Sequence, residues 1–139
     1  MKTNFFICIA VLACIFCTSC SKVEFTSISL LSNTADLVVT NQTTGLSTKS
    51  NALPLDVKNG DKITIEYTPQ NKYSKYSWKV VFDVFDTSTT ITQSPYSMTT
   101  TVQDMPIGNH KIRCSAIIAD DNVIFTGVEG GYITINIIK

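Results

Sequence analysis

Short segments in which apolar and polar residues alternate run through most of the chain. In the clearest one, residues 62–68, every second residue is apolar. Another, residues 78–84, places four apolar side chains on one face, namely Trp78, Val80, Phe82 and Val84. Strict period-two alternation indicates β-strands with one buried and one solvated face. No comparable apolar stripe occurs at helical spacing, so the pattern predicts an all-β fold.

Turn-forming residues separate these segments at intervals of about ten residues. Residues 58–61 (Lys-Asn-Gly-Asp) and 120–122 (Asp-Asp-Asn) are strong turn signals. Pro69 and Pro95 each end a segment, because proline cannot donate to a β-ladder. Short strands at this spacing are typical of a β-sandwich. A jelly roll and a small up-and-down barrel are alternatives that fit the same pattern.

Three finer expectations concern single segments. Residues 36–40 should continue an edge strand that begins near Val23, and residues 41–51 should form a polar loop around a glycine. The glycine-rich stretch 127–131 should interrupt the last strand, with a bulge or bend at Gly130-Gly131.

The first 19 residues have the order of features found in secretory signals. Lys2 precedes an apolar run from Phe5 to Phe16, and the small residues Thr18 and Ser19 follow. A run of about a dozen apolar residues is too short to cross a hydrocarbon core, which needs about 20 at helical rise. This order predicts a segment that is removed on export. A buried hydrophobic helix of the domain is the alternative.

The end of this segment, Cys17-Thr18-Ser19-Cys20, resembles the lipobox of bacterial lipoproteins, although Cys17 stands where leucine is usual. The polar residues that follow resemble the tether of lipoproteins from Bacteroides-type bacteria. The resemblance implies a signal peptide over residues 1–19, acylation such as palmitoylation of Cys20, and a tether over residues 20–26. It also implies a lipid-anchored protein of the bacterial cell envelope, at the outer membrane, on its periplasmic or surface face. Several acyl chains would anchor the protein stably, since one chain alone binds only marginally.

The remaining residues, 27–139, resemble immunoglobulin-like and PKD-like domains of bacteria. Residues 60–65 resemble the second strand of such domains, and Trp78 stands where they keep a core tryptophan on the third strand. Residues 108–114 resemble the penultimate strand, with His110 where tyrosine is more usual. The resemblance implies a single immunoglobulin-like β-sandwich. It lacks the intersheet disulfide, because Ile65 replaces the second-strand cysteine.

The fate of the cysteines depends on the N-terminal segment. Cys8, Cys14 and Cys17 would leave with the signal, and lipid on Cys20 would leave Cys114 alone. We then expect Cys114 to be buried as a small hydrophobic residue. A Cys20–Cys114 disulfide is the alternative, and it would require ordinary signal-peptidase cleavage.

Few groups suit catalysis or metal binding. His110, the sole histidine, shares a strand face with Cys114, but residues four apart on a strand are separated by about 13 Å. No Cys/His cluster suggests zinc, and no glycine-rich phosphate loop is present. Four carboxylates are candidates for calcium, although a turn explains the last two more simply: Asp83, Asp86, Asp120 and Asp121. We expect no enzyme, no metal site and no cofactor.

Three tyrosines beside turns are the predicted ligand-binding residues: Tyr73, Tyr76 and Tyr96. Exposed aromatic rings stack on sugars or anchor protein contacts, and packing at a sheet edge is the alternative. Eleven acidic and eleven basic residues give a formal net charge of +0, without a basic patch, so we expect no nucleic-acid partner.

The sequence therefore predicts a non-catalytic, lipid-anchored cell-envelope protein whose domain binds a protein or glycan partner. The membrane would be a second partner, through the lipid on Cys20. One alternative is a structural subunit of an envelope or fimbria-like assembly that adds strands between subunits. A small hydrolase is the other alternative, and it would need two carboxylates held across a cleft.

Overall fold

The computed structural model describes residues 24–32 and 36–139. The predicted signal peptide, residues 1–19, and the predicted lipidation site at Cys20 lie outside this part of the chain. No helix in the described part is long and apolar enough to span a membrane. The elements are β1 (Thr26–Ser32), β2 (Asp36–Asn41), β3 (Ser47–Lys49), β4 (Leu55–Lys58), β5 (Lys62–Thr68), the 3-10 helix η1 (Asn71–Tyr73), β6 (Trp78–Val84), β7 (Thr87–Ile91), β8 (Ser97–Thr101), β9 (Gly108–Ile118) and β10 (Val123–Ile138).

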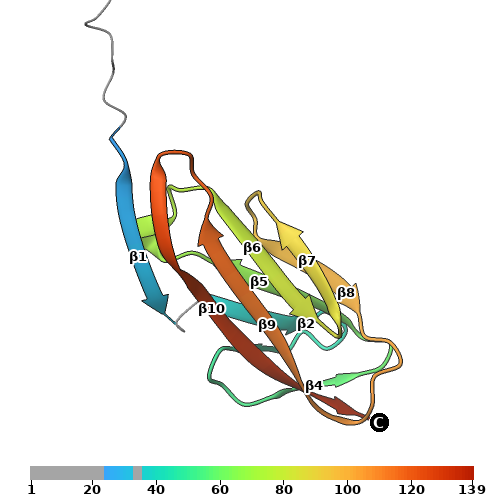
Figure 1. The fold of residues 1–139 in the computed structure, drawn as a ribbon. Coiled ribbons are helices and arrows are strands. Elements are labelled where there is room, and N and C mark those ends of the chain that lie inside the picture. Colours follow the sequence, from blue (N-terminus) through green and yellow to red (C-terminus); the bar gives the residue numbers. More distant parts are fainter. Residues whose placement is uncertain (1–23, 33–35) are drawn as a thin grey trace, which may run out of the picture.

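The strands form two sheets that pack face to face (Figure 1). The larger sheet has the order β1-β10-β9-β6-β7, and the smaller sheet has the order β3-β2-β5-β8. Both β1 and β4 pair in parallel with β10. β1 pairs with the first half of β10, and β4 pairs with the last four residues of β10. The other pairings are antiparallel. The predicted all-β sandwich is confirmed.

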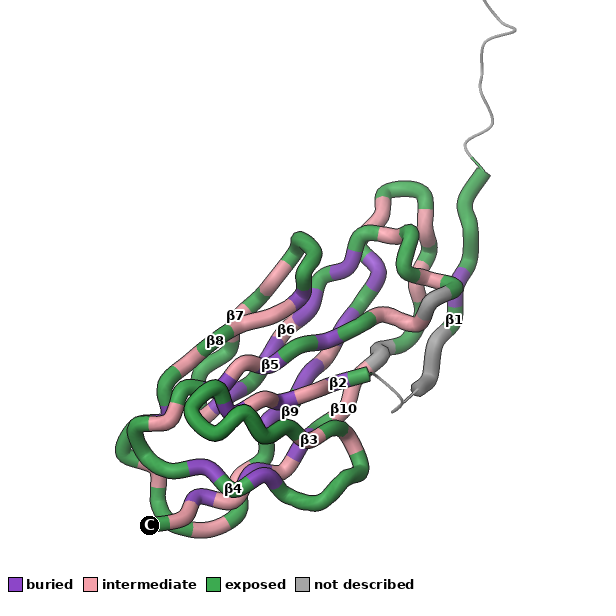
Figure 2. Tube along the Cα trace, turned by 180° about the vertical axis from the view of Figure 1, so that it is seen from behind, coloured by how far each residue is buried: buried purple, intermediate pink, exposed green. Residues whose placement is uncertain are grey.

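The core lies between the sheets, where every second residue of the central strands is buried (Figure 2). The period-two prediction is confirmed for 62–68 and 78–84, since the alternate apolar residues of both lie in this core. Val81, on the other face of 78–84, is half-buried. The ring of Trp78 packs edge-on against Tyr67 at 6.0 Å and against Phe125 at 6.1 Å between ring centroids. Such aromatic pairs add about 0.5–1.5 kcal/mol each beyond the area they bury. The fold is therefore held by core packing around Trp78.

Two expectations about the first half of the domain are wrong. Strand β2 does not continue an edge strand, because it lies inside the smaller sheet between β3 and β5. Its residues Leu37 and Val39 are fully buried in the core between the sheets. Residues 41–51 do not form only a loop, because β3 folds back on β2 through a turn that contains Gly45 at φ 75°.

The expected interruption of the last strand is also wrong. β10 is continuous from Val123 to Ile138, and its register against β9 stays constant from Glu129 to Ile137. No bulge therefore occurs at Gly130-Gly131. A Cβ atom on Gly130 would lie 2.8 Å from the carbonyl oxygen of Cys114, so close approach of the two backbones explains this glycine.

Candidate functional site

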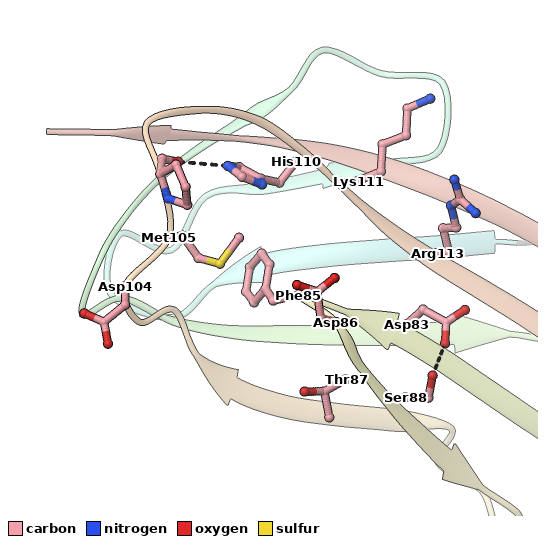
Figure 3. Close-up of a pocket in the computed structure, with 11 residues that line it drawn as sticks. Asp83, Phe85, Asp86, Thr87, Ser88, Asp104, Met105, His110, Lys111 and Arg113 are labelled. Carbon is pink, nitrogen blue, oxygen red and sulfur yellow. Dashed lines mark hydrogen bonds between the residues drawn. The ribbon is translucent and has the colours of Figure 1, made fainter.

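A hollow of about 700 Å³ opens at one end of the larger sheet (Figure 3). It exists because β6 and β9 differ in length. β6 pairs with β9 only as far as Asp83, opposite Arg113, whereas β9 extends on to Gly108. The chain turns away at Phe85-Asp86 into β7, and the space beside the first residues of β9 stays open. The loop between β8 and β9 closes its far side with Asp104, Met105 and Pro106.

The turn at the edge of this hollow has an unusual backbone. Phe85 and Asp86 have φ values of 48° and 66°, and they form the two-residue link between β6 and β7. Positive φ at both positions is the geometry that matches the twist of a tight hairpin. For residues other than glycine the left-handed region costs about 1–2 kcal/mol. The Phe85 ring packs edge-on against His110 at 6.4 Å, a contact that helps to hold the turn.

Charged groups of both signs line the hollow. Asp83 and Asp86 come from the β6–β7 hairpin, and Lys111 and Arg113 come from β9. The hydroxyl of Ser88 donates a hydrogen bond to Oδ1 of Asp83, which fixes that carboxylate on the hairpin (Figure 3). The wall formed by β9 therefore supplies hydrogen-bond donors, and the hairpin supplies acceptors. A ligand rich in hydroxyl groups can use both.

His110 has a structural contact inside this site. Its Nε2 atom hydrogen-bonds to the carbonyl oxygen of Pro106 at 2.8 Å, and its ring faces Phe85. The histidine thereby ties the β8–β9 loop to β9. Cys114 lies four residues further along the same unbroken strand and is buried. At strand rise this separates the two residues by about 13 Å, so they do not form a nucleophile–base pair.

The four carboxylates considered as calcium candidates do not come together. Asp83 and Asp86 lie at the hollow, beside the first half of β9. Asp120 and Asp121 lie in the turn that follows the other end of β9. In residues 24–32 and 36–139, no group of three or more histidine, cysteine, aspartate or glutamate side chains is placed to hold a metal ion.

The prediction that Tyr96 is an exposed aromatic residue is wrong. Its side chain is 8% exposed, and its ring packs edge-on against Tyr67. Its hydroxyl accepts a hydrogen bond of 3.2 Å from the backbone N–H of Trp78. The residue stands in phase with the buried Val102, so the same alternation that defines β8 turns its ring into the core.

Tyr73 and Tyr76 are half-buried and pack against the core at the start of β6. Each ring has a neighbouring lysine above it, Lys72 at 4.7 Å and Lys75 at 5.0 Å. The carbonyl oxygen of Tyr73 accepts a hydrogen bond of 3.1 Å from Nε1 of Trp78. These tyrosines thus lie at the end of β6 opposite the hollow, and ligand binding by them stays a prediction.

One aromatic residue near the hollow was not among the predicted binding residues. Tyr132 on β10 is 52% exposed, and Nζ of Lys111 lies 4.6 Å from the centre of its ring. The sequence contained a signal for this position. Ile133, Ile135 and Ile137 follow Tyr132 at every second position, which predicts a strand with the isoleucines on its buried face. Burial of the isoleucines places Tyr132 on the outer face of the sheet.

Comparison with known proteins gives no further assignment. No protein-family model, curated protein or solved structure matches the chain.

Proposed function

We propose that the protein is a non-catalytic, lipid-anchored protein of the bacterial cell envelope, and that its sandwich domain binds a polar ligand in the hollow beside β9. The observation that carries this proposal is the arrangement of donors and acceptors there. Lys111 and Arg113 line the hollow from one strand, and Asp83 and Asp86 line it from the neighbouring hairpin. Residues on strands of a packed sheet are held in fixed positions, which suits recognition.

The arrangement favours binding over hydrolysis. A glycosidase needs two carboxyl groups on opposite sides of the bond that it cleaves. In this hollow, Asp83 and Asp86 share the wall of the hairpin, and cationic groups form the wall of β9. The third carboxylate, Asp104 on the β8–β9 loop, points away from the other two (Figure 3). His110 is engaged with the carbonyl of Pro106, so a general base at that position would have to leave its contact.

The position of the first strand supports an anchored role. The backbone N–H of Thr26, at the start of β1, donates to the carbonyl of Asn122 in the β9–β10 turn at 3.0 Å. The hollow lies at the other end of β9, which spans about 33 Å over its eleven residues at strand rise. A chain anchored through Cys20 would therefore present the hollow away from the membrane (Figure 1).

Binding can be tested with the full chain, expressed in a bacterium that processes lipoproteins and extracted in a detergent without a sugar headgroup. A glycan array and pull-down from envelope fractions would identify ligands for the wild type. We expect Lys111→Ala and Asp86→Ala to weaken binding, and Lys79→Ala to leave it unchanged. Lys79 is a suitable control because it is exposed on β6 outside the hollow. Equal binding by all variants, or hydrolytic turnover that is lost with one carboxylate, would contradict the proposal.

A further inference from the structure

The hollow continues onto the outer face of the larger sheet. A second hollow of about 360 Å³ shares Asp83 and Arg113 with the first and reaches Gly130 and Tyr132 on β10. A third, of about 210 Å³, shares Tyr132 with the second and ends at Asn51 in the β3–β4 connection. Neighbouring hollows share lining residues, so the three lie one after another along β6, β9 and β10. We call them together the outer-face groove.

The groove runs across the strands rather than along them. Ser88 is paired with Asp83, Asp83 with Arg113, and Arg113 with Tyr132, so the register places these four residues in one row. The row crosses β7, β6, β9 and β10, and three strand spacings of about 4.8 Å make it about 14 Å long. Its members are on the outer face, because the adjacent Phe82, Ile112 and Ile133 are buried in the core.

The chemistry along the row is mixed and balanced in charge. Asp83 and Ser88 offer a carboxylate and a hydroxyl, and Arg113 offers guanidinium donors in a fixed plane. Gly130 and Gly131, which carry no side chains, line the second hollow beside Tyr132. The Tyr132 ring forms the boundary between the second and third hollows. Lys111 lies against it at 4.6 Å, an attraction that helps to hold the ring in place.

We propose that the outer-face groove binds an uncharged linear glycan, with one sugar ring stacked on Tyr132 and its hydroxyl groups bonded to Asp83 and Arg113. This inference rests on the proposed binding function and names the ligand class. An extended row of planar polar side chains and one exposed aromatic ring suits a chain of sugars, which presents apolar ring faces and many hydroxyl groups. The balanced charge of Asp83 and Arg113 favours an uncharged glycan.

Other extended ligands fit the groove less well. An added peptide strand pairs its backbone with the edge of a sheet, whereas this groove crosses the face of a sheet whose central strands are already paired. A nucleic-acid strand would need a positive groove that follows its backbone. Here the carboxylates of Asp83 and Asp86 lie in the same hollow as the cations.

The test is isothermal titration calorimetry of the full chain in a detergent without a sugar headgroup. The ligands are four uncharged hexasaccharides and, for each, the disaccharide of the same sugar and linkage. The probes are cellohexaose, xylohexaose, maltohexaose and mannohexaose. We expect at least one hexasaccharide to bind about tenfold more tightly than its disaccharide. Tyr132→Ala should lose about tenfold in affinity, as expected for loss of one stacked ring, and Tyr132→Phe should stay within about twofold. Circular dichroism of each variant checks that the sandwich is intact.

Two results of the titration would overturn the inference. One is the absence of binding by all four hexasaccharides, and the other is unchanged hexasaccharide affinity in Tyr132→Ala. A protein ligand that depends on Lys111 and Asp86 but not on Tyr132 would overturn the glycan assignment and leave the binding function standing. If the wild type binds no ligand in the pull-down and array experiments, both the glycan assignment and the proposed binding function are contradicted.

Discussion

The side-chain amide of Asn41 donates a hydrogen bond of 2.7 Å to the carboxylate of Asp61, and so joins the end of β2 to the turn between β4 and β5. Asn41 is fully buried. Its Oδ1 atom accepts from the backbone N–H groups of Thr43 at 2.9 Å and Thr44 at 3.3 Å. Asp61 in turn accepts from the backbone N–H of Lys58 at 2.9 Å. Two loops at this end of the smaller sheet therefore depend on one side-chain contact.

Replacing Asp61 with alanine should lower the free energy of unfolding by about 1–3 kcal/mol, because the buried amide of Asn41 loses its acceptor. Urea denaturation, followed by the fluorescence of the buried Trp78, measures the change. Asp36→Ala is the matched control, since Asp36 is an exposed carboxylate at the start of β2 and should change stability by at most about 0.5 kcal/mol. Equal stabilities for the two variants would contradict the importance of the Asn41–Asp61 contact.

Asp61 should also make stability depend on pH in the acid range. The hydrogen bond from the backbone of Lys58, aided by those from Asn41 and Thr43, lowers the pKa of this carboxyl, although burial acts in the opposite direction. Since the pKa is lower in the folded state, the charged carboxylate stabilises the fold above its unfolded pKa of about 3.9. That contribution disappears as the pH falls through the folded pKa.

The stability difference between wild type and Asp61→Asn, measured from pH 7 to pH 2, tests this sign. It should be largest near neutral pH and shrink below about pH 4. A difference that grows on acidification would show that the pKa is raised, not lowered.

The hydroxyl of Tyr96 should contribute to stability. Tyr96→Phe keeps the ring in the core but leaves the buried backbone N–H of Trp78 without this acceptor. We expect a loss of about 1–3 kcal/mol in the free energy of unfolding. Tyr132→Phe removes a hydroxyl from a half-exposed ring and should change stability by at most about 0.5 kcal/mol. If both variants unfold at the same urea concentration as the wild type, the contact has no net effect.

Local alternation was enough to predict which residues form the core, because every second side chain of a strand points to the same face of the sheet. Ile63, Ile65 and Trp78 are examples. The same rule would have placed Tyr132 outside and Tyr96 inside. Sheet membership is different, because β2 pairs with β5 across a sequence separation of more than 20 residues. Nothing within residues 36–41 specifies that partner.

The hollow was beyond local prediction for the same reason. It arises where the pairing of β6 ends at Asp83 while β9 continues, and that offset is a property of the register between distant strands. The left-handed turn at Phe85-Asp86 adds to this, because neither residue is the glycine that such a turn usually contains. The charged residues could be read from the sequence, but their proximity in one hollow could not be predicted from it.

Gly130 should tolerate no side chain. A Cβ atom there would approach the carbonyl oxygen of Cys114 to 2.8 Å, so Gly130→Ala requires the backbones of β9 and β10 to move apart. We expect a cost of about 1–3 kcal/mol, typical of overpacking in a well-packed region. Ser115→Ala, at the position paired with Gly130, is the control and should be close to neutral. A stable Gly130→Ala variant would show that the strands can separate freely.

The anchor proposed at Cys20 can be tested independently of any ligand. Cells that express the full chain should incorporate radiolabelled palmitate into the wild type, and Cys20→Ala should abolish the label, because the acylated cysteine is then missing. Cys8→Ala is the control, since Cys8 would leave with the signal peptide and its loss should leave labelling intact. The unlabelled Cys20→Ala protein should also leave the membrane fraction on washing, because it lacks the acyl chains that would anchor it. Label retained in Cys20→Ala would refute the lipoprotein assignment and leave the sandwich and its groove unaffected.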